Sequence, residues 1–196
     1  MRSPLVAVLL LFFLVAPVLA QDVVESKTGT KFVAKDGDTS LLGVGLRTKT
    51  IAKVKVYAIG LYVANSALAG PLKGKAGSTD LSGELVNGDF EKRVVLKFVR
   101  NVTANQIRDA FRESLQGAGN NAEPWIAYFN DVQSGQEIVI AWAPHAGLET
   151  KVAGADKPAI NDQAFASAVF AIWLGDKPIQ QDLKRDLTSR AAELVK

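Results

Sequence analysis

The chain has 196 residues, 48% of them hydrophobic, with no cysteine and one histidine. The absence of cysteine excludes disulfides, thiol nucleophiles, iron–sulfur clusters and zinc sites with cysteine ligands. The single His145 excludes histidine-pair metal sites, and it follows Pro144 in a stretch typical of a turn. The net charge of +3 is spread without runs, which is not the pattern of a nucleic-acid-binding protein.

The first twenty residues have the organisation of a secretory signal peptide. Arg2 is followed by an uninterrupted apolar stretch of twelve residues, 5–16, and Val18 and Ala20 are small residues of the kind that signal peptidase requires. The stretch is shorter than the roughly 20 residues that cross a bilayer. We therefore predict cleavage after Ala20, a periplasmic or secreted protein without a stable membrane anchor, and one domain over residues 21–196.

The first half of the mature chain is predicted to be rich in strands. Apolar and polar residues alternate over most of it, and glycine, aspartate and asparagine mark the breaks. The least periodic part, residues 65–90, is predicted to be a loop-rich crossover with a short strand near 84–86. The strands expected around it are a hairpin over 22–33 and strands over 40–47, 51–64 and 91–100.

The second half is predicted to combine helices with a pair of strands. Apolar residues recur there at helical spacing, with capping residues before each run. The expected elements are a helix from Thr103 to 117–121, a short helix from Pro124 to 134–135, strands over 136–142 and 149–152, a helix from Asn161 or Asp162 to Gly175, and a helix from Pro178 to Leu194. This order indicates an α+β fold.

One group of residues stands out as a candidate site. Gly43, Gly45 and Arg47 are predicted to share a strand face with Leu41, and the glycines leave that face bare for either another backbone or a ligand. Tyr57 follows where the next strand changes from lysines to apolar residues. A guanidinium and a phenol beside an apolar cavity suit a ligand with an anionic head and an apolar body. Alternatively, Arg47 pairs with an acidic neighbour and Tyr57 is a core residue.

Four sequence blocks resemble the bacterial chalcone isomerase-like family. They are G-V-G-L-R from Gly43, K-V-Y-A-I-G-L-Y-V from Lys55, F-E-K-R-V from Phe90 and A-I-W-L-G-D-K-P from Ala171. The resemblance implies a chalcone isomerase fold, which is a curved, largely antiparallel sheet covered by a layer of helices, with a ligand cleft between them. Plant chalcone-flavanone isomerases and fatty-acid-binding relatives share that fold.

The resemblance also transfers roles to individual positions. The catalytic arginine of the plant isomerases corresponds to Arg47, and Tyr57 stands where they have a threonine, as in the non-catalytic fatty-acid-binding relatives. Ile107 and Ser114 stand where the isomerases have a tyrosine and an asparagine. The implied ligand-binding residues are therefore Arg47, Tyr57, Ile107 and Ser114, and only Arg47 remains as a catalytic candidate.

These observations predict an exported, non-catalytic protein that binds a small amphipathic anion such as a fatty acid. An alternative is an intramolecular lyase of the chalcone isomerase type, acting on an aromatic ligand with Arg47 as electrophilic stabiliser. A third possibility is an interaction module whose cleft is vestigial. No metal, other cofactor or nucleic-acid partner is expected.

Overall fold

The computed structural model describes residues 22–49 and 52–195. The predicted signal peptide, residues 1–20, lies outside this range. Within the described residues, no helix is both long and apolar enough to cross a membrane.

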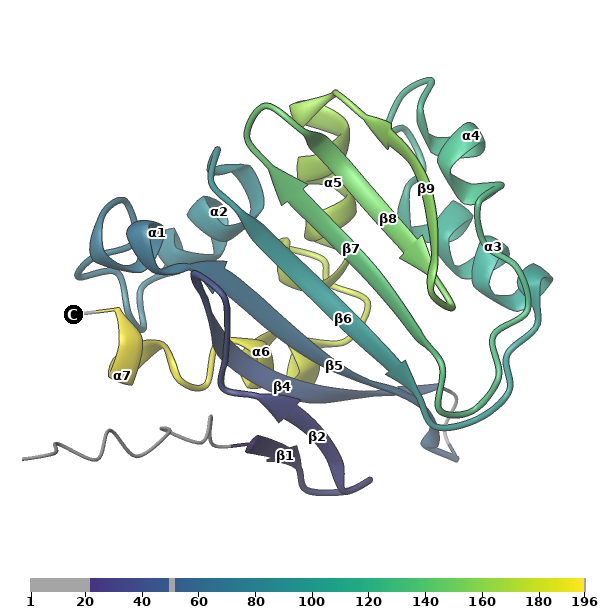
Figure 1. The fold of residues 1–196 in the computed structure, drawn as a ribbon, viewed down its shortest axis with the longest axis horizontal. Coiled ribbons are helices and arrows are strands. Elements are labelled where there is room, and N and C mark those ends of the chain that lie inside the picture. Colours follow the sequence, from purple (N-terminus) through teal and green to yellow (C-terminus); the bar gives the residue numbers. More distant parts are fainter. Residues whose placement is uncertain (1–21, 50–51, 196) are drawn as a thin grey trace, which may run out of the picture.

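The centre of the fold is a seven-stranded antiparallel sheet in which strands adjacent in sequence are also adjacent in space (Figure 1). This arrangement confirms the predicted α+β class and the antiparallel sheet. The strands are β3 (Lys35–Asp36), β4 (Thr39–Lys49), β5 (Val54–Ala64), β6 (Lys92–Phe98), β7 (Glu137–Ala143), β8 (Gly147–Val152) and β9 (Ala155–Ile160).

A separate hairpin covers part of the outer sheet face. It consists of β1 (Asp22–Glu25) and β2 (Thr30–Val33), as predicted for residues 22–33. Phe32 of this hairpin packs with Leu41, Ala58 and Tyr62 in a small outer cluster. A Cβ on Gly60 would come within 2.7 Å of the Phe32 ring, so this glycine permits the hairpin to lie close to β5.

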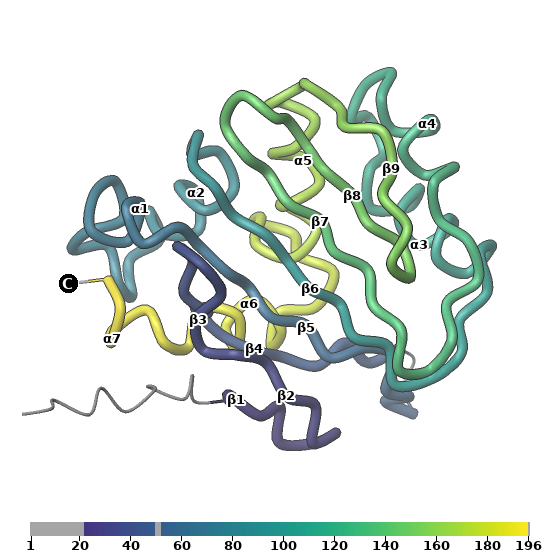
Figure 2. The backbone as a smooth tube through the Cα atoms, viewed as in Figure 1, coloured from purple at the N-terminus to yellow at the C-terminus, as the bar shows by residue number. Residues whose placement is uncertain are grey.

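The helices cover the other face of the sheet, and the main core lies between the two layers. Figure 2 shows α1 and α7 at one end of the sheet, and α3 and α4 at the other. The helices are α1 (Asn65–Ala69), α2 (Thr79–Asn87), α3 (Ala104–Ser114), α4 (Ala122–Ile126), α5 (Gln163–Leu174), α6 (Gln181–Leu187) and α7 (Ala191–Leu194).

Two predicted helix starts are confirmed. The Thr103 hydroxyl accepts a hydrogen bond from the backbone N–H of Gln106, whose side chain accepts one from the Thr103 N–H. This capping box fixes the start of α3 beside the sheet. The Asp162 carboxylate caps α5 by accepting from the Phe165 N–H at 3.0 Å.

The prediction for residues 65–90 was wrong in its secondary structure. Residues 84–86 belong to α2 instead of forming a strand. Leu81 and Leu85, four residues apart, are both buried, and α2 packs against α5. The spacing of this apolar pair is helical. The sequence did not indicate a helix clearly, because Gly83 is a poor helix former and the adjacent Leu85 and Val86 also suit a short strand.

The last predicted helix is broken in two. It begins at Gln181, after Pro178, and residues 188–190 separate α6 from α7. At this break the Arg190 N–H donates to the Leu42 carbonyl oxygen at 3.0 Å, and the Arg190 guanidinium donates to the Leu41 carbonyl oxygen at 2.8 Å. These bonds tie the chain to β4 where a continuous helix would carry it away.

Two further elements differ from the sequence-based prediction. The helix expected from Pro124 to 134–135 ends at Ile126, because Val132 instead pairs with Val102 in an isolated antiparallel bridge. The edge strand β9 was not predicted. Its residues are mostly exposed, so it lacks the alternation that marks a half-buried strand.

Candidate ligand-binding cavity

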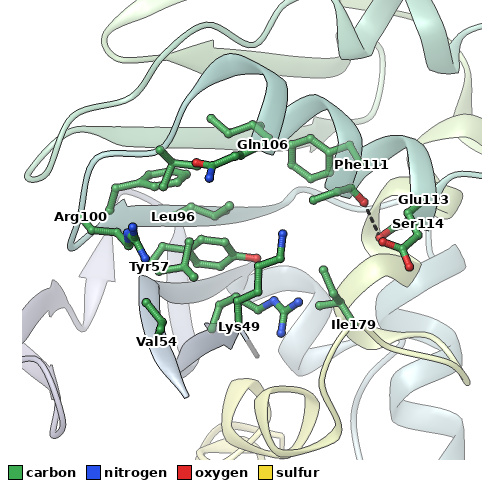
Figure 3. A pocket seen from close by; sticks show the side chains of 16 residues that line it. Lys49, Val54, Tyr57, Leu96, Arg100, Gln106, Phe111, Glu113, Ser114 and Ile179 are labelled. Atoms are coloured by element: carbon green, nitrogen blue, oxygen red, sulfur yellow. Dashed lines mark hydrogen bonds between the residues drawn. The ribbon is translucent and has the colours of Figure 1, made fainter. Parts of the chain in front are cut away.

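A cavity of about 560 Å³ lies between α3 and the ends of β4, β5 and β6 (Figure 3). That size falls in the usual range for small-molecule sites. Its lining residues are Arg47, Lys49, Val54, Val56, Tyr57, Leu96, Phe98, Arg100, Val102, Gln106, Ile107, Ala110, Phe111, Glu113, Ser114 and Ile179.

The inner walls are apolar and held by aromatic packing. The rings of Tyr57 and Phe98, on adjacent strands, have centroids 5.4 Å apart. On the helical side, Phe111 packs against Trp125 and Phe129 at centroid distances of 5.0 and 4.7 Å. These contacts fix the wall positions, so the cavity is formed by the fold before any ligand enters.

Arg47 lies directly opposite Tyr57 on the neighbouring antiparallel strand. Its Nη1 donates to the Thr48 carbonyl oxygen at 2.5 Å and to Gln180 Oε1 at 3.3 Å. Both acceptors are neutral, so these contacts leave the guanidinium charge uncompensated. The alternative prediction, in which Arg47 pairs with an acidic neighbour, does not describe these two hydrogen bonds.

Gln180, immediately before α6, holds this part of β4 in place. Its Oε1 accepts from the Thr48 N–H at 3.0 Å, and its Nε2 donates to the Leu46 carbonyl oxygen at 3.1 Å. Strand β3 pairs with β4 only at Thr39 and Ser40, so this end of β4 is an open sheet edge whose backbone groups the Gln180 amide satisfies. Gln180 therefore positions Arg47, a role that the sequence analysis missed because the two residues are 133 positions apart.

Tyr57 presents a neutral hydroxyl to the cavity. Burial raises the pKa of this phenol, while the Trp173 N–H and the positive Arg47 oppose the rise. Trp173 Nε1 donates to the Tyr57 oxygen at 3.1 Å. Among the described residues this is the only hydrogen bond of the hydroxyl, so its proton remains able to donate to an acceptor in the cavity.

Ile107 and Ser114 belong to α3 and line the cavity from its helical side. Ile107 is buried and presents hydrocarbon. Ser114 is exposed, and its hydroxyl donates to the Ala110 carbonyl oxygen of its own helix at 2.9 Å. The structure thus brings all four predicted site residues, Arg47, Tyr57, Ile107 and Ser114, to one cavity.

Two cations at the opening were missed by the sequence analysis. Lys49 lies at the end of β4, and Arg100 follows β6; both side chains are exposed. Glu113 is the single acidic residue of the lining. The available signal was spacing, because Lys49 lies two residues beyond Arg47 and Arg100 two beyond the buried Phe98.

The bare strand face formed by the glycines is filled by a helix. A Cβ on Gly43 would overlap the Asp186 carbonyl oxygen, and one on Gly45 would lie 2.5 Å from the Leu183 side chain. Of the two alternatives, the glycines therefore admit another backbone, that of α6. Leu41 does not share their face: a register shift between Leu41 and Gly43 turns Leu41 to the outer cluster.

The described residues include no group of three or more histidine or acidic side chains arranged to hold a metal ion. The donors that the cavity offers include the guanidinium of Arg47, the phenol of Tyr57, the side-chain amide of Gln106 and the two cations at the opening. Such a set binds an anionic or carbonyl oxygen atom.

An antiparallel sheet backed by helices, with an apolar cavity at one end, defines a class of α+β proteins with an internal site of small-molecule size. Within that class the chain belongs to the chalcone isomerase-like family, whose pattern matches residues 20–188.

The chain is also similar to two relatives and to one solved structure. It is 29% identical over 177 residues to chalcone isomerase-like protein 1 of Humulus lupulus, covering 78% of this chain and 82% of that protein. It is 25% identical over 205 residues to fatty-acid-binding protein 2 of Arabidopsis thaliana, covering 88% of this chain but only 52% of that protein.

The solved structure is the Arabidopsis thaliana fatty-acid-binding protein AtFAP1. It superposes with a TM-score of 0.73 at 21% identity, over 89% of this chain and 99% of that one. The likeness confirms the predicted chalcone isomerase-like fold.

Proposed function

We propose that this protein is a non-catalytic binder of a small amphipathic anion, most simply a fatty acid. The observation that carries the proposal is the pairing of Arg47 with the neutral hydroxyl of Tyr57 on adjacent strands of an apolar cavity. A carboxylate accepts from both groups, and each charge-assisted bond contributes about 1.5–3 kcal/mol.

The apolar walls account for the rest of the ligand. Val56, Leu96, Val102, Ile107 and Phe111 offer hydrocarbon to an acyl chain. Each buried methylene contributes about 0.8 kcal/mol, so the chain supplies most of the affinity and Arg47 supplies the orientation. The fatty-acid-binding names of one relative and of the structural neighbour support this ligand class.

The test is calorimetric titration of the mature protein with dodecanoate. Arg47→Ala is expected to weaken binding about ten- to a hundredfold, because the carboxylate loses its charged partner. Arg47→Lys recovers only part of that loss, since the ammonium lacks the planar two-pronged geometry. Arg112→Ala on the same side of the fold is the control, because Arg112 is bonded to Asp109 and Glu123 outside the cavity. Equal affinity of wild type and Arg47→Ala would refute the proposed role.

A catalytic role is tested with the same variants. In the isomerase alternative, Arg47 polarises the carbonyl of a chalcone while the substrate phenolate attacks. Ile107 supplies no polar group for that attack, so we expect no cyclisation above the rate in buffer. An acceleration that disappears in Arg47→Ala would replace the binding proposal with an isomerase.

We also propose that the protein acts outside the cytoplasm. The basis is the charged start, the apolar stretch and the small residues before Gln21. Amino-terminal sequencing of protein recovered from its own host is expected to begin within two residues of Gln21. An intact Met1 on exported protein would contradict cleavage.

A further inference from the structure

The β4–β5 hairpin has a strongly polarised distribution of charge. No aspartate or glutamate occurs between Asp38 and Asp80. The hairpin runs from Thr39 to Ala64, and its four charged residues, all basic, lie within residues 47–55. They are Arg47, Lys49, Lys53 and Lys55.

Other elements extend this basic end. Val99 N–H bonds to the Val56 carbonyl oxygen, so the end of β6 and the following Arg100 lie beside the start of β5. From the outer face, Lys55 Nζ donates to the carbonyl oxygen of Lys27, in the turn between β1 and β2. We define the basic tip as Lys27, Lys49, Lys53, Lys55 and Arg100.

The carboxylate of Glu25, at the start of the turn that contains Lys27, already accepts hydrogen bonds from that turn. Glu25 is 5% exposed, and its carboxylate accepts from the backbone N–H groups of Lys27 and Thr28 and from the Thr28 hydroxyl. It therefore faces inward, away from solvent. In the part of the chain that the structure describes, none of the five tip cations forms a salt bridge, with Glu113 of the cavity lining or with any other acid, so their charge is left for a partner outside the molecule.

The basic tip adjoins the opening of the cavity. Lys49 and Arg100 belong to both, and Val54 of the cavity lining pairs with Lys49 across the hairpin. Val54 is 37% exposed and is one of only three large apolar side chains exposed among the described residues. An exposed valine surrounded by lysines is the pattern of a surface that rests on a lipid headgroup layer, with the lysine stems extending along the apolar boundary.

We propose that the basic tip docks on anionic phospholipid bilayers and so places the cavity opening against the membrane, where an acyl ligand is exchanged. This inference rests on the proposed function for the identity of the exchanged ligand. A bilayer is favoured over a protein partner because the cations are mostly flexible lysines, which fit a diffuse negative surface without fixed geometry. Each cation near such a surface contributes roughly fivefold in affinity.

The test uses co-sedimentation of the mature protein with two kinds of vesicle. One contains phosphatidylcholine alone, and the other contains equal parts of phosphatidylcholine and phosphatidylglycerol. Binding is expected only to the second kind, and it is expected to disappear at about 1 M salt, where the Debye length is about 3 Å. Binding that is equal on both vesicles or insensitive to salt would overturn the proposal.

A pair of variants with equal net charge separates local docking from overall charge. Lys53→Glu with Lys55→Glu changes the basic tip without altering the cavity lining. Lys35→Glu with Lys73→Glu makes the same charge change away from the tip, because Lys35 pairs with Ser40 near the start of β4 and Lys73 follows α1, beyond the end of β5. The first pair is expected to weaken vesicle binding more than tenfold, and the second pair much less. Equal losses would overturn the proposal.

Two further readouts keep the proposals distinguishable. Both double variants should bind dodecanoate in buffer as the wild type does, while only the tip variant should accept it slowly from phosphatidylglycerol vesicles. If no form binds dodecanoate but vesicle docking follows the pattern above, docking stands and the fatty-acid proposal fails. Wild-type binding to soluble polyglutamate but not to these vesicles would overturn the lipid partner in favour of an acidic protein.

Discussion

The Tyr57 hydroxyl can both donate and accept hydrogen bonds, and Trp173 determines which of these the cavity offers. The indole N–H of Trp173 can only donate, so it occupies a lone pair of the phenol oxygen. Burial keeps the phenol protonated by raising its pKa. The cavity therefore presents a hydrogen-bond donor, which favours a carboxylate over an alcohol of the same chain length.

Replacing Trp173 with Phe tests this arrangement. The Phe ring keeps most of the packing but removes the N–H, so the Tyr57 hydroxyl is free to turn. Dodecanoate affinity is expected to fall about three- to tenfold, and discrimination against dodecanol is expected to shrink. Calorimetric titration with both compounds measures the two effects.

Two controls distinguish hydrogen bonding from lost packing. Trp142→Phe removes an indole that donates to Asp89 outside the cavity, and it should leave discrimination unchanged. In a Tyr57→Phe background, Trp173→Phe should have little further effect on the preference for the carboxylate. An undiminished preference in the single Trp173→Phe variant would show that the indole does not orient the phenol.

The site also depends on how two elements approach each other. Strand β4 and helix α6 come so close at Gly43 that a Cβ would overlap backbone atoms of α6. The same helix is preceded by Gln180, which holds the end of β4 and Arg47. Close packing of α6 on β4 is therefore part of what positions the guanidinium.

Two glycine-to-alanine variants should have opposite effects on stability. Gly43→Ala forces β4 and α6 apart and is expected to lower the free energy of unfolding by about 1–3 kcal/mol. Gly83→Ala, in α2, meets open space and should raise it by about 0.5–1 kcal/mol, because alanine favours the helix. Urea unfolding of both variants measures the difference; destabilisation by Gly83→Ala, or none by Gly43→Ala, would contradict the packing argument.

Gly43 and Gly83 also illustrate which features of the secondary structure the sequence alone could not predict. Alternation predicted β4 and β5, and apolar spacing with capping residues predicted α3 and α5. Alternation could not predict the register shifts between β4 and β5, because an extra residue in either strand reverses the faces without changing the local sequence pattern. The helical assignment of Gly83 and its neighbours required the contact between α2 and α5, which lie far apart in the sequence.

Some residues of the candidate site could likewise be predicted from the sequence, and others could not. Arg47 and Tyr57 were predictable because their residue types suit one ligand chemistry and their strands are adjacent. Gln180 was not, since its amide acts through a contact between distant segments. The glycines allowed two interpretations until the position of α6 decided between them.

For the molecule as a whole, Lys92 links stability to pH. Its side chain is 1% exposed, and its Nζ donates to the carbonyl oxygens of Val86 and Gly88 at 3.0 and 2.9 Å. The rings of Phe90 and Phe170 lie about 5 Å from the same nitrogen. The ammonium thus bonds to carbonyl groups at the end of α2 from inside the core, joining sheet and helices.

Burial lowers the pKa of Lys92 from 10.5 to about 8, although the charges of Asp89 and Glu84 oppose the change. Between these two values the unfolded chain binds more protons than the folded one, so this residue makes stability rise with pH. The full effect amounts to roughly 3 kcal/mol. The raised pKa values of Tyr57 and Tyr62, the latter about 12, act in the opposite direction above pH 10.

The comparison of wild type with Lys92→Met between pH 7 and 10 isolates this contribution. Methionine keeps the length of the side chain but cannot titrate. The free energy of unfolding of the wild type, relative to the variant, is therefore expected to rise by about 2 kcal/mol over this range, and the titration of the tyrosines cancels because both proteins carry the same ones. Urea titrations at each pH measure it, and dodecanoate affinity should be the same in both proteins, because Lys92 lies outside the cavity lining. If the free energies of unfolding of the two proteins changed in parallel with pH, the buried lysine would keep its ordinary pKa. Solvent access, or a negative charge that acts more strongly than Asp89, would then offset the burial.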